Sequence, residues 1–186
     1  MKEDKPNTTQ KGVKEDLDVI KKFCKQHQQT LAVAESASSG ALQLLFSSEE
    51  EAGLFFEGGL TLYNCEQKRR QLRIPTALCN PCNGVSKEIS EKLALNICEL
   101  YQSNFGLGLT GYASPFPEAG VYDLHAFGAA AHNGKVLFCE KLKSQKESPE
   151  EIREDYACIL LKLFTNYLKS HPEIVQESFL SKKKGY

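Results

Sequence analysis

The spacing of apolar residues along the chain predicts helices that alternate with short strands. Apolar side chains recur every three to four positions from Val13 to Cys24, which indicates one face of an amphipathic helix. The run Leu31-Ala32-Val33-Ala34 is short and uniformly apolar, as expected of a buried strand. Further strands are expected at 54–63, 105–109, 126–131 and 136–139, and further helices at 41–46, 65–72, 86–100 and 149–167. This order of elements indicates an α/β fold.

Turn and cap residues mark the ends of several of these elements. Asn133-Gly134 lies between two apolar runs and predicts a β-hairpin. Ser86 is typical of a helix N-cap, and Ser148-Pro149-Glu150-Glu151 forms a capping box with proline at the first helical position. Pro75, Pro81 and Gly84 interrupt residues 74–84, which we therefore expect to form a loop.

The length and charge of the chain limit the classes of protein to which it can belong. It has 186 residues, 41% of them hydrophobic, with 23 basic and 24 acidic residues, which suits one globular domain. The balanced charge argues against a dedicated nucleic-acid or membrane-surface binder, and no apolar run reaches the roughly 18 residues of a membrane span. We expect a mobile polar leader at 1–12, a single domain at 13–170 and a charged tail at 171–186 that includes Lys182–Lys184.

The seven cysteines favour a reduced, cytoplasmic protein. Their number is odd, and a domain of this size builds a core without cross-links. Cys79-Asn80-Pro81-Cys82 is a single CxxC, which suits half a zinc site, a redox pair or two ordinary loop cysteines. Because there is no second CxxC and the histidines are isolated, we expect ordinary thiols and no metal. The cysteines are Cys24, Cys65, Cys79, Cys82, Cys98, Cys139 and Cys158.

Two turns follow predicted strands and carry candidate chemistry. Ligands of α/β folds bind at the carboxyl ends of strands, where Glu35–Gly40 and Thr110–Pro115 are expected to lie. The serines and glycine of the first turn open a helix, so they could cradle an anion with unpaired N–H groups or could simply cap that helix. The local pattern favours the cap.

Lys68 is a candidate general base within Tyr63-Asn64-Cys65-Glu66-Gln67-Lys68. Burial lowers the pKa of a lysine and allows it to take a proton from a serine. Lys68-Arg69-Arg70 equally suits the solvated face of a basic helix, and the residue pattern alone favours this second interpretation.

Four motifs in this order resemble the CinA C-terminal domain family, whose active members are nicotinamide mononucleotide amidohydrolases. The resemblance covers roughly residues 13–168. The family pattern A-E-S-C-T-G-G is matched by Ala34–Gly40, and Y-S-N-E-x-K by Tyr63–Lys68. G-A-V-S is matched by Asn83–Ser86, and T-G-I-A-G-P by Thr110–Pro115.

The resemblance implies a three-layer α/β/α sandwich that forms a homodimer. It also implies hydrolysis of a pyridine-nucleotide carboxamide, or a related amide, to the acid and ammonia by a serine/lysine mechanism without metal or cofactor. Lys68 falls on the family's base, Tyr63 on the accompanying tyrosine, and Ser36 on a polar active-site position. The residues that the resemblance places at the substrate are Glu35, Ser38, Ser39, Gly40, Asn64, Thr110 and Gly111.

Two family residues are missing from their aligned positions. An alignment without gaps places the expected serine nucleophile on Gly53, which has no side chain to acylate, and the phosphate-binding arginine near Pro149. We therefore expect a stand-alone family member with lost or altered catalysis. The alternatives are an active amidohydrolase that uses Ser36 with Lys68, and a non-catalytic nucleotide-binding or dimeric interaction module.

Overall fold

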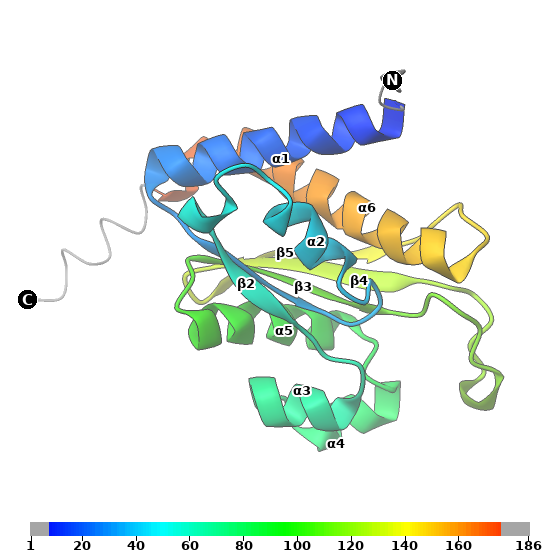
Figure 1. Ribbon diagram of the computed structural model, residues 1–186. Coiled ribbons are helices and arrows are strands. Elements are labelled where there is room, and N and C mark those ends of the chain that lie inside the picture. Colours follow the sequence, from blue (N-terminus) through cyan, green and yellow to red (C-terminus); the bar gives the residue numbers. More distant parts are fainter. Residues whose placement is uncertain (1–7, 176–186) are drawn as a thin grey trace, which may run out of the picture.

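A five-stranded mixed sheet forms the middle layer of the fold, in the order β2-β1-β3-β4-β5 (Figure 1). β1 pairs in parallel with both β2 and β3, whereas β4 runs antiparallel to β3 and β5. The computed structural model describes residues 8–175. The strands are β1 (Leu31–Glu35), β2 (Phe56–Thr61), β3 (Phe105–Gly111), β4 (Ala126–His132) and β5 (Lys135–Leu142).

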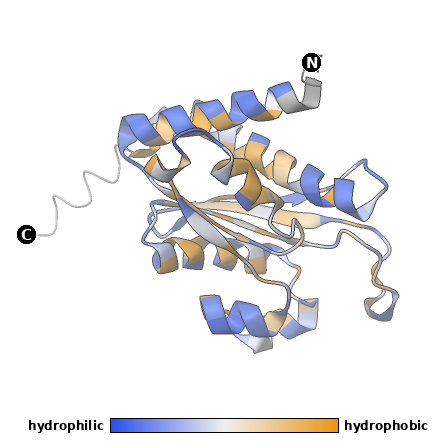
Figure 2. Ribbon diagram, viewed as in Figure 1, coloured by the Kyte–Doolittle hydropathy of each residue, from blue (hydrophilic) through white to orange (hydrophobic). Residues whose placement is uncertain are grey.

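Helices cover both faces of the sheet, which confirms the expected three-layer α/β/α sandwich (Figure 1). One face carries α1 (Thr8–His27), α2 (Ala41–Ser47) and α6 (Pro149–Ser170). The other face carries α5 (Lys87–Tyr101), with α3 (Cys65–Leu72) and α4 (Thr76–Cys79) beside it. The central strands are mostly apolar and α3 is mostly hydrophilic (Figure 2), and no helix within residues 8–175 is long and apolar enough to cross a membrane.

The caps and the hairpin form as their residues predict. The Ser86 hydroxyl accepts the Ile89 N–H at 3.2 Å, and the Ser148 hydroxyl accepts the Glu151 N–H at 3.2 Å. Asn133-Gly134 joins β4 to β5, and both residues have positive φ, 46° and 81°, as a two-residue hairpin turn requires.

Two expected boundaries are wrong. Residues 74–84 contain α4 and a 3₁₀ turn, Asn80–Cys82, because Pro75 precedes the first helix and Pro81 lies in the first turn of the second, where its missing N–H is harmless. α1 begins at Thr8, so residues 8–12 are helical rather than part of a mobile leader. The Lys182–Lys184 segment lies outside the described residues.

The packing of α5 depends on two glycines of β3. A Cβ at Gly106 would lie 2.1 Å from the Ala94 carbonyl oxygen, and one at Gly108 would lie 2.2 Å from the Ser90 carbonyl oxygen. The Ser90 hydroxyl also donates a 2.9 Å hydrogen bond to the Gly108 carbonyl. The absence of side chains at these two positions lets α5 lie close against β3, the strand that carries Thr110.

The strand order creates a crevice at the carboxyl end of β1. The chain passes from β1 to β2 by way of α2 on one face, and from β2 to β3 by way of α3, α4 and α5 on the other. The two connections therefore lie on opposite faces of the sheet, and β1 lies between β2 and β3. Ligand sites of α/β folds lie at such switch points.

Candidate functional site

A cavity of about 360 Å³ opens at the carboxyl ends of the parallel strands. Six of the residues singled out from the sequence line it together, and four, Glu35, Ser38, Ser39 and Gly40, do not. The lining residues are Ser36, Ala37, Tyr63, Asn64, Lys68, Asn83, Val85, Thr110, Gly111, Tyr112, Ala113, Ser114, Pro115, Phe116 and Arg153.

Lys68 and Ser36 form a buried pair at this cavity. Lys68 is only 2% exposed, and its amine donates to the Ser36 hydroxyl at 3.2 Å and to the Leu62 carbonyl at 2.8 Å. Burial lowers the pKa of Lys68 from 10.5 to about 8, against a smaller raising effect of Cys82. The expectation that Lys68 is a solvated residue is therefore wrong, because only one side of α3 faces water.

The last hydrogen bonds of the parallel sheet position this pair. The Ser36 N–H donates to the Leu109 carbonyl of β3 at 2.8 Å, which fixes the serine just beyond β1. The Leu62 N–H donates to the Glu35 carbonyl at 2.7 Å, so the carbonyl that holds the Lys68 amine is itself fixed beyond β2. The relative position of lysine and serine is thus a property of the sheet.

Glu35 is fully buried and binds the start of α2. Its carboxylate accepts a hydrogen bond from the Ser38 hydroxyl, the Leu42 N–H at 3.1 Å, the Gln43 N–H at 3.1 Å and the Gln43 side chain at 2.8 Å. The expected serine cap is therefore wrong, because Gly40 occupies the N-cap position, with φ 106°, and Glu35 takes the helix N–H groups. An anion cradle at this helix end is already filled by the protein's own carboxylate.

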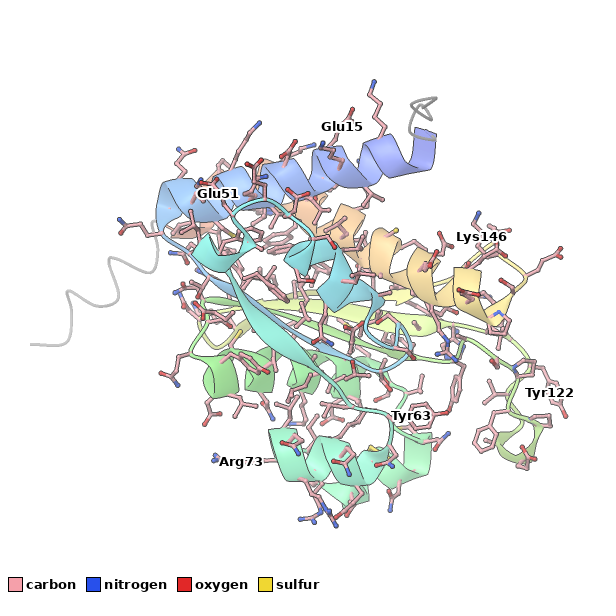
Figure 3. All side chains as sticks on the ribbon, in the orientation of Figure 1. Glu15, Glu51, Tyr63, Arg73, Tyr122 and Lys146 are labelled. Atoms are coloured by element: carbon pink, nitrogen blue, oxygen red, sulfur yellow. A yellow bond between two sulfur atoms is a disulfide. The ribbon has the colours of Figure 1, made fainter. Side chains whose placement is uncertain are left out.

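The remaining predicted residues form the wall and rim of the cavity. Thr110 is buried, and its hydroxyl donates to the Gly84 carbonyl at 2.6 Å. The Asn64 side-chain oxygen caps α3 by accepting the Gln67 N–H at 2.9 Å. Tyr63 is 79% exposed where the chain passes from β2 to α3 (Figure 3). Its expected catalytic role stays a prediction.

Arg153 of α6 lies in the cavity wall, although it was not singled out from the sequence. Its guanidinium donates to the Ala37 carbonyl and to the Ser39 hydroxyl, both at 3.0 Å. The gap-free alignment placed the expected arginine at Pro149, and four residues are about one turn of a helix. Arg153 is the only arginine after Arg73 in the sequence, and this fact could have identified it as the candidate for the family's phosphate-binding arginine.

Gly53 is far from this cavity, which corrects its assignment as the nucleophile position. It lies in the 3₁₀ turn Ala52–Leu54, before β2, whereas Lys68 follows the other end of that strand. At about 3.3 Å per residue, the six residues of β2 separate the two ends of the strand by about 20 Å. The hydroxyl that contacts Lys68 belongs to Ser36.

Cys65 and Cys79 form a disulfide, so the expectation of ordinary thiols throughout is wrong. The bond joins the first residue of α3 to the last residue of α4. Cys82 is a free, half-buried thiol. Within residues 8–175, no group of three or more histidine, cysteine or acidic side chains is placed to hold a metal ion.

Comparison with known proteins identifies the family. A model of the CinA C-terminal domain matches residues 14–168. The chain belongs to this family. A CinA-like protein of Chlorobium chlorochromatii is 30% identical over 155 residues, which are 82% of this chain and 36% of that protein. A CinA-like protein of Desulfovibrio desulfuricans is 33% identical over 97 residues, 52% of this chain and 23% of that protein.

Solved structures of CinA proteins share the fold. A competence or damage-inducible protein from Enterobacter asburiae superposes with a TM-score of 0.77 at 20% identity, covering 84% of this chain and 98% of its own. Competence damage-inducible protein A from Klebsiella pneumoniae gives 0.79 at 18% identity, covering 84% and 97%. The chain spans 36% and 23% of the two curated relatives named above, so their activities as whole proteins are not transferred to it.

Proposed function

We propose that this CinA C-terminal domain is a serine/lysine amidohydrolase, and that its substrate is a pyridine nucleotide carboxamide such as nicotinamide mononucleotide. The observation that carries the proposal is the 3.2 Å contact between the Lys68 amine and the Ser36 hydroxyl in a cavity. A nucleophile and its base need this distance. The sequence alone led us to expect lost or altered catalysis, because the nucleophile position aligned with Gly53. Since Gly53 lies far from Lys68, that reason no longer applies.

In the proposed reaction, neutral Lys68 takes the proton of the Ser36 hydroxyl as the serine oxygen attacks the amide carbon. The lysine then gives that proton to the nitrogen, which leaves as ammonia, and an ester on Ser36 remains. Water, activated by the same amine, hydrolyses the ester to the carboxylic acid and restores the serine. With a pKa of about 8, about a tenth of Lys68 is neutral at pH 7.

The other lining residues suit an anionic nucleotide. Arg153 is half-exposed and brings a guanidinium to the wall, and such groups bind phosphate through paired N–H donors. Asn64 uses its amide oxygen to cap α3, which leaves its NH₂ group as a donor toward the substrate. The volume of about 360 Å³ is within the usual range of about 300–1,000 Å³ for ligand sites.

The test is release of ammonia from nicotinamide mononucleotide by the purified full chain. Ser36→Ala and Lys68→Met should each lower the rate by at least about a thousandfold. Ser47→Ala and Lys135→Met replace exposed residues of the same types and should leave it unchanged. The proposal is wrong if the unaltered protein releases no ammonia above background, or if Ser36→Ala retains the rate.

A second candidate is a nucleotide-binding module without turnover. Ser39 stands where the family pattern A-E-S-C-T-G-G has its first glycine, adopts φ 53°, and ties Arg153 to the turn through its hydroxyl. A guanidinium held in this way is less able to close on a reacting phosphorylated substrate. Thermal stabilisation by nicotinamide mononucleotide without ammonia release would favour this candidate. The homodimer stays a prediction, which sedimentation velocity would test.

A further inference from the structure

Three cysteines lie around Lys68. The Cys65–Cys79 disulfide ties the helix that carries Lys68 to α4. Cys82 follows in the next turn, and its sulfur lies 3.3 Å from the Cys79 carbonyl oxygen. Cys79 is fully buried, whereas Cys65 is half-exposed, so an external reagent can approach the bond from the Cys65 side.

The disulfide and the lysine stem pack against one residue, Gly84. A Cβ placed on Gly84 would lie 3.3 Å from the Cys79 sulfur, 3.5 Å from the Cys65 sulfur and 3.5 Å from Cε of Lys68. The Gly84 N–H donates to the Cys79 carbonyl at 2.8 Å, and its carbonyl accepts the Thr110 hydroxyl at 2.6 Å. A movement of either sulfur would therefore shift Gly84, and with it the neighbouring Lys68 side chain and the Thr110 wall of the cavity.

We propose that Cys65, Cys79 and Cys82 form a thiol–disulfide exchange site, with a low-molecular-weight thiol such as glutathione as co-substrate, which controls how Lys68 is held beside Ser36. The exchange chemistry rests on the Cys65–Cys79 bond and on the place of Cys82 one turn after Cys79. Its consequence for hydrolysis rests on the proposed amidohydrolase function.

The exchange balances in two thiol–disulfide steps. A thiolate of the co-substrate attacks the Cys65 sulfur, the bond to Cys79 breaks, and Cys79 leaves as a thiolate that takes a proton from solvent. A second co-substrate thiolate then attacks the co-substrate sulfur of the mixed disulfide and releases Cys65. The disulfide gains two electrons and two protons, and two co-substrate thiols become one disulfide.

Cys82 provides an internal route with no net oxidation or reduction. Its thiolate attacks the Cys79 sulfur, a Cys79–Cys82 bond forms, and Cys65 leaves as a thiolate that is then protonated. The CxxC spacing of Cys79 and Cys82 is one that disulfide oxidoreductases use. In this route Cys82 resolves the bond and Cys65 becomes the free thiol.

We expect the oxidised form, with the Cys65–Cys79 bond intact, to hold the Lys68 amine beside the Ser36 hydroxyl. Bonded sulfurs lie about 2.0 Å apart, whereas two thiols need normal van der Waals separation and more room beside Gly84. Opening the bond also releases α3 from α4. We therefore expect reduction to move the Lys68 amine toward water and away from Ser36.

The first test is a redox titration of the full chain in glutathione buffers of graded ratio, quenched by alkylation and mapped by peptide mass. We expect Cys65 and Cys79 to be protected at the oxidised end and alkylated at the reduced end. Cys82→Ser should abolish the Cys79–Cys82 bond of the internal route, whereas Cys139→Ser, a half-buried thiol on β5, should leave that bond unchanged. A Cys65–Cys79 bond that never forms or never opens overturns the exchange site, and the absence of a Cys79–Cys82 bond at every glutathione ratio overturns the internal route.

The second test measures Lys68 itself. The pH dependence of its acetylation by acetic anhydride, followed by peptide mass, should have a midpoint near 8 in the oxidised protein and a higher midpoint after reduction. Identical profiles would overturn the control of Lys68. Neither test requires turnover, so a shifted profile without ammonia release in either state would reject the amidohydrolase and leave the exchange site standing.

Discussion

Glu35 at the end of β1 and Lys68 of α3 are two buried charged residues, and they differ in how completely they are hydrogen-bonded. The Glu35 carboxylate accepts four hydrogen bonds from donors of the same short segment, 38–43. The Lys68 amine donates to one fixed carbonyl and to one hydroxyl that faces a cavity. Because the hydrogen-bonding capacity of the Glu35 carboxylate is filled, Glu35 acts as a structural anchor. The Lys68 amine has fewer hydrogen bonds, which leaves it available for proton transfer.

The comparison shows why burial alone does not identify a reactive group. A buried charge that is fully bonded stabilises its surroundings and is costly to disturb. The buried Lys68 amine is hydrogen-bonded to a neutral carbonyl and a hydroxyl, so burial makes its charged form less stable and lowers its pKa. The two residues should therefore respond to neutralisation with opposite signs.

The largest expected effect is the loss of the Glu35 anchor. Glu35→Gln replaces an acceptor oxygen with an NH₂ group that faces the donors of α2, and should lower the free energy of unfolding by about 3 kcal/mol. Urea denaturation followed by circular dichroism measures it. Glu50→Gln, at an exposed carboxylate, is the control and should change stability by less than about 0.5 kcal/mol. Equal effects of both substitutions would show that Glu35 is not an anchor.

Lys68→Met should act in the opposite direction and stabilise the protein at pH 7 by about 1–3 kcal/mol. The folded-state pKa of Lys68, about 8, is below its usual 10.5, so the unfolded chain binds more protons between these values. Stability should therefore rise with pH from about 8 to 10.5 in the unaltered protein, and this rise should be smaller in the variant. Thermal unfolding at pH 7 and pH 10 measures the difference, and a destabilised variant would break the comparison.

The pH dependence of hydrolysis tests whether Lys68, unlike Glu35, takes part in proton transfer. Since the neutral amine is the base, kcat/KM should rise about tenfold per pH unit up to about pH 8 and level off above it. Initial rates of ammonia release between pH 6 and 9.5 measure the profile. A rate that falls across this range would mean that the protonated lysine is the active form.

The smallest expected effect is that of a serine added at the other end of β2. Gly53→Ser should change neither rate nor stability measurably, because position 53 is exposed, has no atom within 4 Å of an added Cβ and is remote from Lys68. The ammonia assay and a thermal melt test it together. A gain of activity would restore position 53 as a nucleophile site.

The sequence predicted the elements well because their signals are local. Alternating polarity, Ser86, Ser148 and Asn133-Gly134 depend on neighbours within a few residues, and the structure has each feature where expected. The burial of Lys68 could not be predicted in this way. It depends on contacts with Ser36, 32 residues earlier in the chain, and with the segment that follows β2. Arg153 was missed because an alignment without gaps hides a shift of one helical turn. The Cys65–Cys79 bond was missed because a disulfide depends on the distance between two residues in space.

The parallel pairing of β1 with β3 has a consequence for how the protein folds. The hairpin of β4 and β5 closes over a two-residue turn, whereas β1 joins β3 through contacts between residues 74 positions apart, such as Thr30 and Asn104. The entropic cost of closing a loop rises with its length, and such non-local pairings slow folding. Because Ser36 depends on that pairing for its position, a folding chain whose hairpin has already formed would still lack its reactive pair until β3 has docked against β1.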